Sequence, residues 1–246
     1  MENRRGNGIF LGVVSVATLV VAIIGATFAY FSASTSSAND AVNLTAYEFN
    51  ASLSVNRVYP EEATAIIPVE PGKTIENAPE GNNTNLLYAL NVAEDRCIDD
   101  SGLQVCALYE VTITNNGTQP LTLGGQIRTV TNNKSTRTGA TPFTNLTYQA
   151  VKGTLGALEL DGNPTQMNLD VDGLTTISTV TVNGATTTEG GETTPGTATT
   201  YVLVYLNENG DQSAEMGASY TGQLIYTTTT GNGNQLTGTF TVSAGE

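Results

Sequence analysis

The sequence contains no histidine and no tryptophan, and it holds only 2 cysteines among 246 residues. Without an imidazole, the chain cannot build an HExxH zinc site, a Ser-His-Asp or Cys-His nucleophile, or an ordinary histidine metal site. Catalysis by carboxylates alone stays formally open, but the acidic residues fall mostly in turn-like contexts such as Asp99-Asp100 and Asp161-Gly162. We therefore expect no enzymatic activity, no metal and no cofactor.

The N-terminus carries the strongest targeting signal of the chain. Arg4 and Arg5 precede a charge-free apolar run over 9–28, which ends in small residues up to Ala29. This order of basic, apolar and small residues is typical of an export signal, and it predicts cleavage between Ala29 and Tyr30. The run is about 20 residues long, enough to span a bilayer, so a retained membrane anchor is the alternative.

Positive charge is scarce throughout the chain. Lys and Arg total 9 against 23 Asp and Glu, which gives a formal net charge of −14. Removal of residues 1–29 leaves 22 acidic and 7 basic residues, a net charge of −15. Nucleic acid and anionic lipid are therefore poor partners, and we expect contact with a membrane only through the N-terminal helix before processing.

The rest of the sequence has the composition of a β protein with many turns, rich in Thr, Asn, Gly, Val and Tyr. About ten short strands separated by Gly and Asn turns predict an all-β fold, a jelly-roll-like antiparallel β-sandwich preceded by an N-terminal hydrophobic signal or anchor helix. We expect almost no helix after the signal. The expected strands are 64–69, 85–92, 105–114, 119–131, 144–160 with a turn at Gly153, 174–182, 200–206, 220–229 and 235–242.

Three segments carry sharper expectations. In 201–206 both alternating sets of side chains are apolar or aromatic, which predicts a central strand that is covered on both faces. The last two strands read as a terminal hairpin, while 186–199 and 132–140 lack apolar periodicity and read as exposed loops. The inward side chains of the hairpin are expected to include Leu224, Tyr226, Phe240 and Val242.

The alternation of apolar residues changes parity near Tyr47-Glu48. Val42, Leu44 and Ala46 occupy one parity, whereas Phe49 and the apolar residues that follow it at every second position occupy the other. A β-bulge explains this change, and so does a separate arm whose apolar side chains are buried elsewhere. The second explanation divides the chain into a signal or anchor at 1–29, an extended arm and candidate donor strand at 30–46, and a β-sandwich domain at 47–246.

Cys97 and Cys106 are the only cysteines, and they flank a turn-rich segment. In an exported chain, a pair this close is most simply a disulfide that staples a hairpin. Its closed loop of 10 residues should restrict the unfolded chain by about 2.7 kcal/mol. A metal or redox role is the alternative.

The end of the signal, Gly25-Ala-Thr-Phe-Ala-Tyr-Phe-Ser32, with the strand-like Val42-Asn-Leu-Thr-Ala46, resembles the TasA/camelysin group of exported bacterial fibre proteins, which have SipW-dependent-type signals. The segment 97–117, and the segment 201–213 together with 217–226, resemble strand blocks of such proteins more weakly. The resemblance implies a jelly-roll subunit of an extracellular biofilm-matrix or cell-surface filament, processed by a SipW-like signal peptidase. It also implies that residues 30–46 complete the β-sheet of a neighbouring subunit.

The chain departs from that group at two points. Camelysin is described as a metalloprotease, and a chain without histidine cannot carry such a site, so no protease activity is transferred. The cysteine pair is also not general to the group. A monomeric, membrane-anchored surface module that binds carbohydrate or a host ligand is the alternative function. Such a module would use tyrosines such as Tyr59, Tyr148 and Tyr205.

Overall fold

The computed structural model describes residues 49–61, 65–76, 78–93, 96–99, 102–229 and 233–244. These residues belong to one compact unit of the chain, 41–246. The strands are β1 (Ala51–Tyr59), β2 (Pro68–Val69), β3 (Ala107–Asn115), β4 (Leu121–Asn133), β5 (Leu146–Thr154), β6 (Ala157–Gln166), β7 (Leu174–Val182), β8 (Thr186–Thr187), β9 (Thr193–Thr194), β10 (Gly196–Asn207), β11 (Ser219–Thr228) and β12 (Gln235–Ser243). A short helix, α2 (Asn85–Asn91), and a 3₁₀ turn, η1 (Ser213–Glu215), accompany them.

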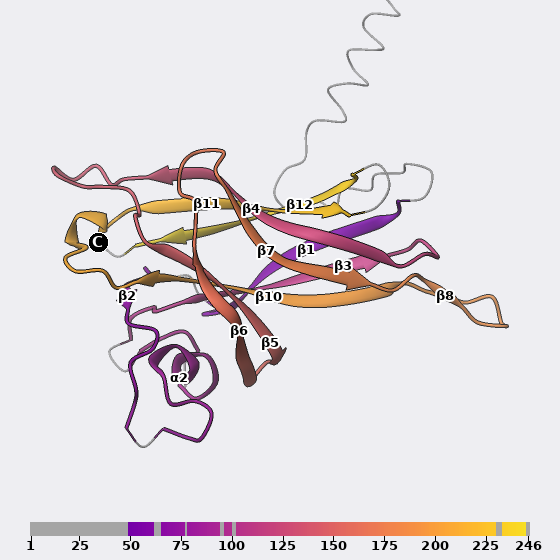
Figure 1. Cartoon of the computed structure of the whole chain (residues 1–246), viewed down its shortest axis with the longest axis horizontal. Coiled ribbons are helices and arrows are strands. Elements are labelled where there is room, and N and C mark those ends of the chain that lie inside the picture. Colours follow the sequence, from indigo (N-terminus) through magenta and orange to yellow (C-terminus); the bar gives the residue numbers. More distant parts are fainter. Residues whose placement is uncertain are drawn as a thin grey trace, which may run out of the picture. The chain divides into compact units, whose positions relative to one another are not determined.

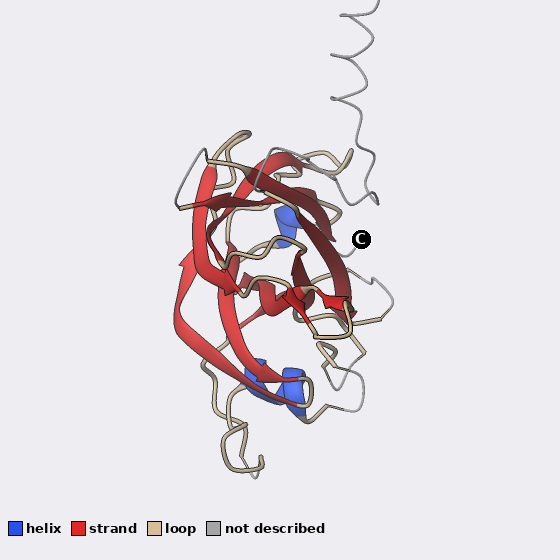
Figure 2. Ribbon diagram, turned by 90° about the vertical axis from the view of Figure 1, so that its right-hand side faces the viewer, coloured by secondary structure: helices blue, strands red, loops and turns tan. Residues whose placement is uncertain are grey.

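Two antiparallel sheets form the body of the domain (Figures 1 and 2). One has the order β1-β3-β10-β5-β6, with β2 added in parallel at the end of β10, and the other has the order β12-β11-β4-β7. Side chains from both sheets share one buried apolar cluster. The expectation of an all-β antiparallel sandwich is therefore confirmed.

The larger sheet is covered on both faces. Val202, Val204 and Leu206 point into the cluster between the sheets, whereas Leu203 and Tyr205 belong to a second cluster with α2 and the cysteines. All five side chains are buried, so the prediction that 201–206 is a central strand with two covered faces is confirmed. The terminal hairpin of β11 and β12 is confirmed as well, with its predicted inward side chains in the cluster between the sheets.

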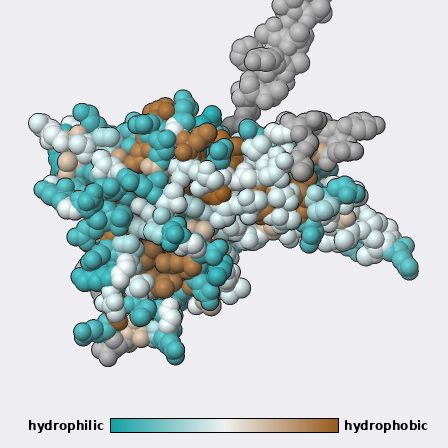
Figure 3. Space-filling model, viewed as in Figure 1, coloured by the Kyte–Doolittle hydropathy of each residue, from teal (hydrophilic) through white to brown (hydrophobic). Residues whose placement is uncertain are grey.

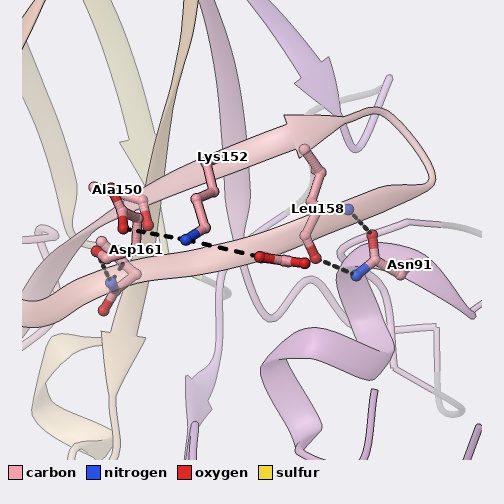
Figure 4. Close-up of polar contacts among 7 residues, drawn as sticks. Asn91, Ala150, Lys152, Leu158 and Asp161 are labelled. Carbon is pink, nitrogen blue, oxygen red and sulfur yellow. Dashed lines mark hydrogen bonds and ion pairs between the residues drawn. The ribbon is translucent and has the colours of Figure 1, made fainter. Parts of the chain in front are cut away.

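Helix α2 corrects one prediction, because residues 85–92 were expected to form a strand. Its apolar residues Leu86, Ala89 and Leu90 are buried on one side, at the spacing of a helix. Asn91 fixes its end: the side-chain amide donates to the Leu158 carbonyl (2.7 Å) and its oxygen accepts from the Leu158 N–H (2.8 Å), as Figure 4 shows. A contact distant in sequence therefore positions this short helix.

Three other boundaries differ from expectation. Of the expected strand 64–69, residues 65–69 are described, and among these only the two residues of β2 form a strand, after an isolated bridge at Ile66. The segment 186–199, expected to be a loop, contains the exposed two-residue strands β8 and β9 and the start of β10. The β5–β6 turn falls at 155–156 and not at Gly153, because β5 stays paired with β6 as far as Thr154, which pairs with Ala157.

The surface is mostly polar. On the face shown in Figure 3, hydrophilic and intermediate side chains cover most of the domain, and apolar ones gather in small separate patches. Among the described residues, no helix is long and apolar enough to cross a membrane. The expected signal or anchor helix at 1–29 and the arm at 30–46 lie outside the described residues.

Several tyrosines bring hydroxyl groups into the interior. Burial raises the pKa of Tyr109 to about 12, although the nearby Arg57 lowers it. Burial likewise raises the pKa of Tyr205 to about 12, and that of Tyr220 to about 12 against a lowering hydrogen bond with Thr129. Each phenol therefore keeps its proton to a higher pH in the folded state than in the unfolded chain, where the pKa of tyrosine is about 10.

The domain should lose stability in alkali. Because the pKa of each buried phenol is higher in the folded state, these phenols contribute stability that is complete below about pH 10. This stability is lost as the pH rises toward 12. Urea unfolding across this range should show a falling midpoint, and Tyr205→Phe should lessen the fall because it removes one buried phenol. A midpoint that does not change up to pH 12 would contradict the assignment of these tyrosines as buried and protonated.

Candidate functional site

The structure tests only part of the predicted site. Cleavage between Ala29 and Tyr30, and the donor anchors Val42, Leu44 and Ala46, fall outside the described residues. The other half of the parity argument is visible. The side chains of Phe49, Ala51 and Leu53 are all buried in the cluster between the sheets, so the alternation that follows the predicted arm belongs to the domain itself.

The cysteine prediction is confirmed. Cys97 and Cys106 form a disulfide with a Cα–Cα distance of 4.9 Å, and both residues are fully buried. An antiparallel bridge pairs Ile98 with Gln104 inside the loop, so the bond staples a small hairpin. The Cys97 N–H also donates to the Ala89 carbonyl (2.8 Å), which joins the hairpin to α2. The pair stabilises the layer that covers the outer face of the larger sheet.

The residues considered for a sugar-binding module are not arranged as a platform. Tyr148 and Tyr205 lie on β5 and β10 and are buried, and Tyr59 is partly buried at the end of β1. Their rings pack in the two apolar clusters. Within the described residues, no group of three or more Asp, Glu, Cys or His side chains lies close enough to hold a metal ion.

One side of the sandwich is closed where β1 meets β12. A Cβ atom at Gly238 would lie 2.5 Å from the Val55 side chain, so only a glycine permits this approach of the two strands. Nearby, the Thr241 carbonyl accepts hydrogen bonds from Tyr109 Oη (2.6 Å) and Arg57 Nη2 (2.7 Å). These contacts occupy part of the β12 edge and hold β12 against β1.

The opposite side of the sandwich has edge strands that are poorly suited to pairing. On β7, the register against β4 shifts between Leu123 and Gly125, and the Ser178 N–H points to Tyr148 Oη at 3.5 Å. The pairing of β5 with β6 shifts between Tyr148 and Ala150. Bulges and side-chain contacts of this kind interrupt the regular ladder that an added strand needs.

A pocket of about 380 Å³, which we call the end pocket, lies where β10 and β12 end. Its wall includes Ile66, which donates its N–H to the Ser243 carbonyl (2.7 Å) and bridges both Gln104 and Ala244. Two large apolar side chains in the lining are exposed, Leu103 at 47% and Met216 at 37%. The pocket is therefore an apolar hollow that is open to solvent.

Two buried polar side chains also line the end pocket. Gln212 and Glu215 are 9% and 3% exposed. The Gln212 side-chain oxygen accepts from the Asn209 N–H (3.0 Å), and Glu215 Oε1 accepts from the Thr144 hydroxyl. Gln212 Nε2 and Glu215 Oε2 are buried and have no hydrogen-bond partner in the described part of the chain. Such atoms are rare in folded proteins because burial removes them from water.

The end pocket and the start of the domain lie at opposite ends of the sandwich. The chain enters at Phe49, and Ala51 pairs with Asn115, which pairs with Gly196 at the start of β10. Leu206, near the end of β10, lines the pocket. The ten residue steps along β10 from Gly196 to Leu206 span about 33 Å.

Sequence reasoning missed the end pocket. Its polar residues lie in Asp-Gln-Ser-Ala-Glu, which has no motif and reads as a turn. Its apolar wall comes from five separate parts of the chain, near residues 66, 103, 206, 216 and 244. Comparison with known proteins adds no assignment: no protein-family model matches the sequence, and no curated protein matches it.

Proposed function

We propose that this chain is a structural subunit of an extracellular filament, of a biofilm matrix or a bacterial cell surface, that assembles by donating its N-terminal arm to a neighbouring copy. The parity of the buried residues carries this proposal. Phe49, Ala51 and Leu53 are buried in the domain's own core. Val42 and Leu44 fall on the other parity, so in a continuous strand they would face away from that core.

Donation of an extended arm suits this composition. A docked strand gains main-chain hydrogen bonds, and its alternate side chains enter pockets of the partner. At roughly 1.5–3 kcal/mol for each fully buried Val or Leu, two anchors and their hydrogen bonds stabilise a lasting contact. The contact joins two different surfaces, so it propagates from copy to copy and does not close on itself.

The resemblance to the TasA/camelysin group extends the proposal. It supplies the jelly-roll arrangement of the strands, the export route through a SipW-like signal peptidase and a place outside the cell. The buried disulfide fits an oxidising compartment of this kind. In the alternative function, a monomeric membrane-anchored module that binds carbohydrate or a host ligand, Tyr148 and Tyr205 would not contact the ligand, because they are buried.

Electron microscopy of the purified secreted chain tests the proposal directly. We expect unbranched filaments to form from the chain alone, because arm and acceptor lie on the same molecule. The proposal would be refuted if the chain stays monomeric at every concentration, even after chemically fixed copies that carry the arm are added.

Export should produce a defined mature N-terminus. We expect mass spectrometry of the secreted protein to find Tyr30 as its first residue, because cleavage after Ala29 leaves Thr27 and Ala29 as small side chains at the recognised positions. Cell-surface fractions that retain residues 1–29 would instead favour the anchored alternative.

A further inference from the structure

Two side chains that line the end pocket carry polar atoms without a hydrogen-bond partner among the described residues. Glu215 Oε2 accepts hydrogen bonds, whereas Gln212 Nε2 donates them, and both are buried. A backbone amide offers the matching pair, an N–H and a C=O, and the apolar lining suits an apolar side chain beside it. An anionic ligand does not fit, because it would meet the Glu215 carboxylate.

We propose that the end pocket of one copy binds residues 42–46 of a second copy. The Leu44 side chain enters the apolar part of the pocket beside Leu103 and Met216. Backbone groups of the arm pair with Glu215 Oε2 and Gln212 Nε2. This inference rests on the proposed function and names the acceptor that the function requires. The segment fits the pocket because 42–46 contains no charged residue.

Chain length requires that the occupant come from another molecule. Leu44 is five residues from Phe49, and an extended chain spans at most about 3.6 Å per residue, or about 18 Å here. The strand axis alone places the end pocket about 33 Å from the end where Phe49 enters. Residues 42–46 therefore cannot reach the pocket of their own chain. Binding to the next copy arranges the subunits head to tail.

The other surfaces of the domain are less suitable acceptors. The seam between β1 and β12 is closed at Gly238, and part of its edge is occupied at Thr241. The β6 and β7 edges have register shifts. The end pocket combines an open apolar hollow with a buried donor and a buried acceptor that lack partners among the described residues.

Cross-linking between two singly substituted chains tests the site. Secreted full chains carrying Leu44→Cys and Met216→Cys are mixed under assembly conditions, oxidised and separated on a non-reducing gel. The matched control replaces Met216→Cys with Leu155→Cys, an exposed residue (44%) in the β5–β6 turn. We expect the Met216 pair to cross-link at least about tenfold more than the control, as a specific contact requires. Equal yields would overturn the proposal.

A second pair of variants measures assembly without added thiols. Leu103→Trp places a bulky ring at the exposed rim of the pocket, and Leu155→Trp makes the same change on the β5–β6 turn. The first should slow filament growth at least about tenfold, and the second should leave it unchanged. Filaments that grow normally in both variants, without the specific cross-link, would reject the end pocket but retain the filament function. A Met216 cross-link in a chain that forms no filaments would support the pocket and reject the filament.

Discussion

Deletion of residues 30–46 is expected to abolish filament formation while leaving a folded domain. The domain's own first strand runs from Ala51 to Tyr59 and pairs with β3 along its length. Phe49 already anchors it in the core. Loss of the arm should therefore change the melting temperature of the monomer by no more than about 2 °C, the effect of a surface change in a domain of this size.

A single substitution should have the same effect on assembly. Leu44→Asp places a carboxylate where an apolar acceptor surface is expected, at a cost of several kcal/mol unless the charge is paired. Ser36→Asp is the matched control, because it adds the same charge to the arm outside residues 42–46. Circular dichroism should show that both variants are folded, and electron microscopy should find filaments only in the control.

The bulge alternative makes the opposite prediction for the same measurements. If residues 42–46 belong to the sheet of their own subunit, their deletion and Leu44→Asp should both unfold the monomer. A collapse of the melting transition in the deleted chain would end the donor-arm hypothesis. Retention of filaments by a folded Leu44→Asp variant would show that this side chain is not an anchor.

Much of the sandwich could be predicted because the pattern of apolar and polar residues within each strand indicates which side chains are buried. In 201–206 both parities are apolar, and the structure buries them in two separate clusters. Helix α2 could not be predicted in this way. Its residues 86–90 are apolar or aromatic at neighbouring positions, and the hydrogen bonds of Asn91 to Leu158 join residues 67 apart in sequence. Such a contact leaves no local periodicity to detect.

The candidate acceptor was harder to predict than the candidate donor. The arm can be recognised from the sequence because apolar and polar residues alternate within one continuous segment, Val42-Asn-Leu-Thr-Ala46. The end pocket is assembled from chain segments that approach one another only after folding. Gln212 and Glu215 became candidates because burial separates them from water, which no sequence pattern reports. Donor segments are local, whereas acceptor surfaces depend on the completed fold.

Removal of the disulfide is expected to cost the domain about 2.7 kcal/mol of unfolding free energy, from the freedom restored to a ten-residue loop in the unfolded chain. The loss should be felt mainly in the outer layer, where Cys97 and Cys106 pack with Leu86 and Leu90 of α2. For a domain of this size, we expect the melting temperature to fall by about 5–11 °C.

Two measurements separate the cross-link from the packing of the cysteines. Reduction of the native chain in urea removes only the bond, whereas a double Cys97→Ala, Cys106→Ala variant also removes two fully buried sulfur atoms. The variant should therefore be at least as unstable as the reduced chain, because it also leaves a cavity. An unchanged urea midpoint after full reduction would show that the hairpin does not depend on its staple.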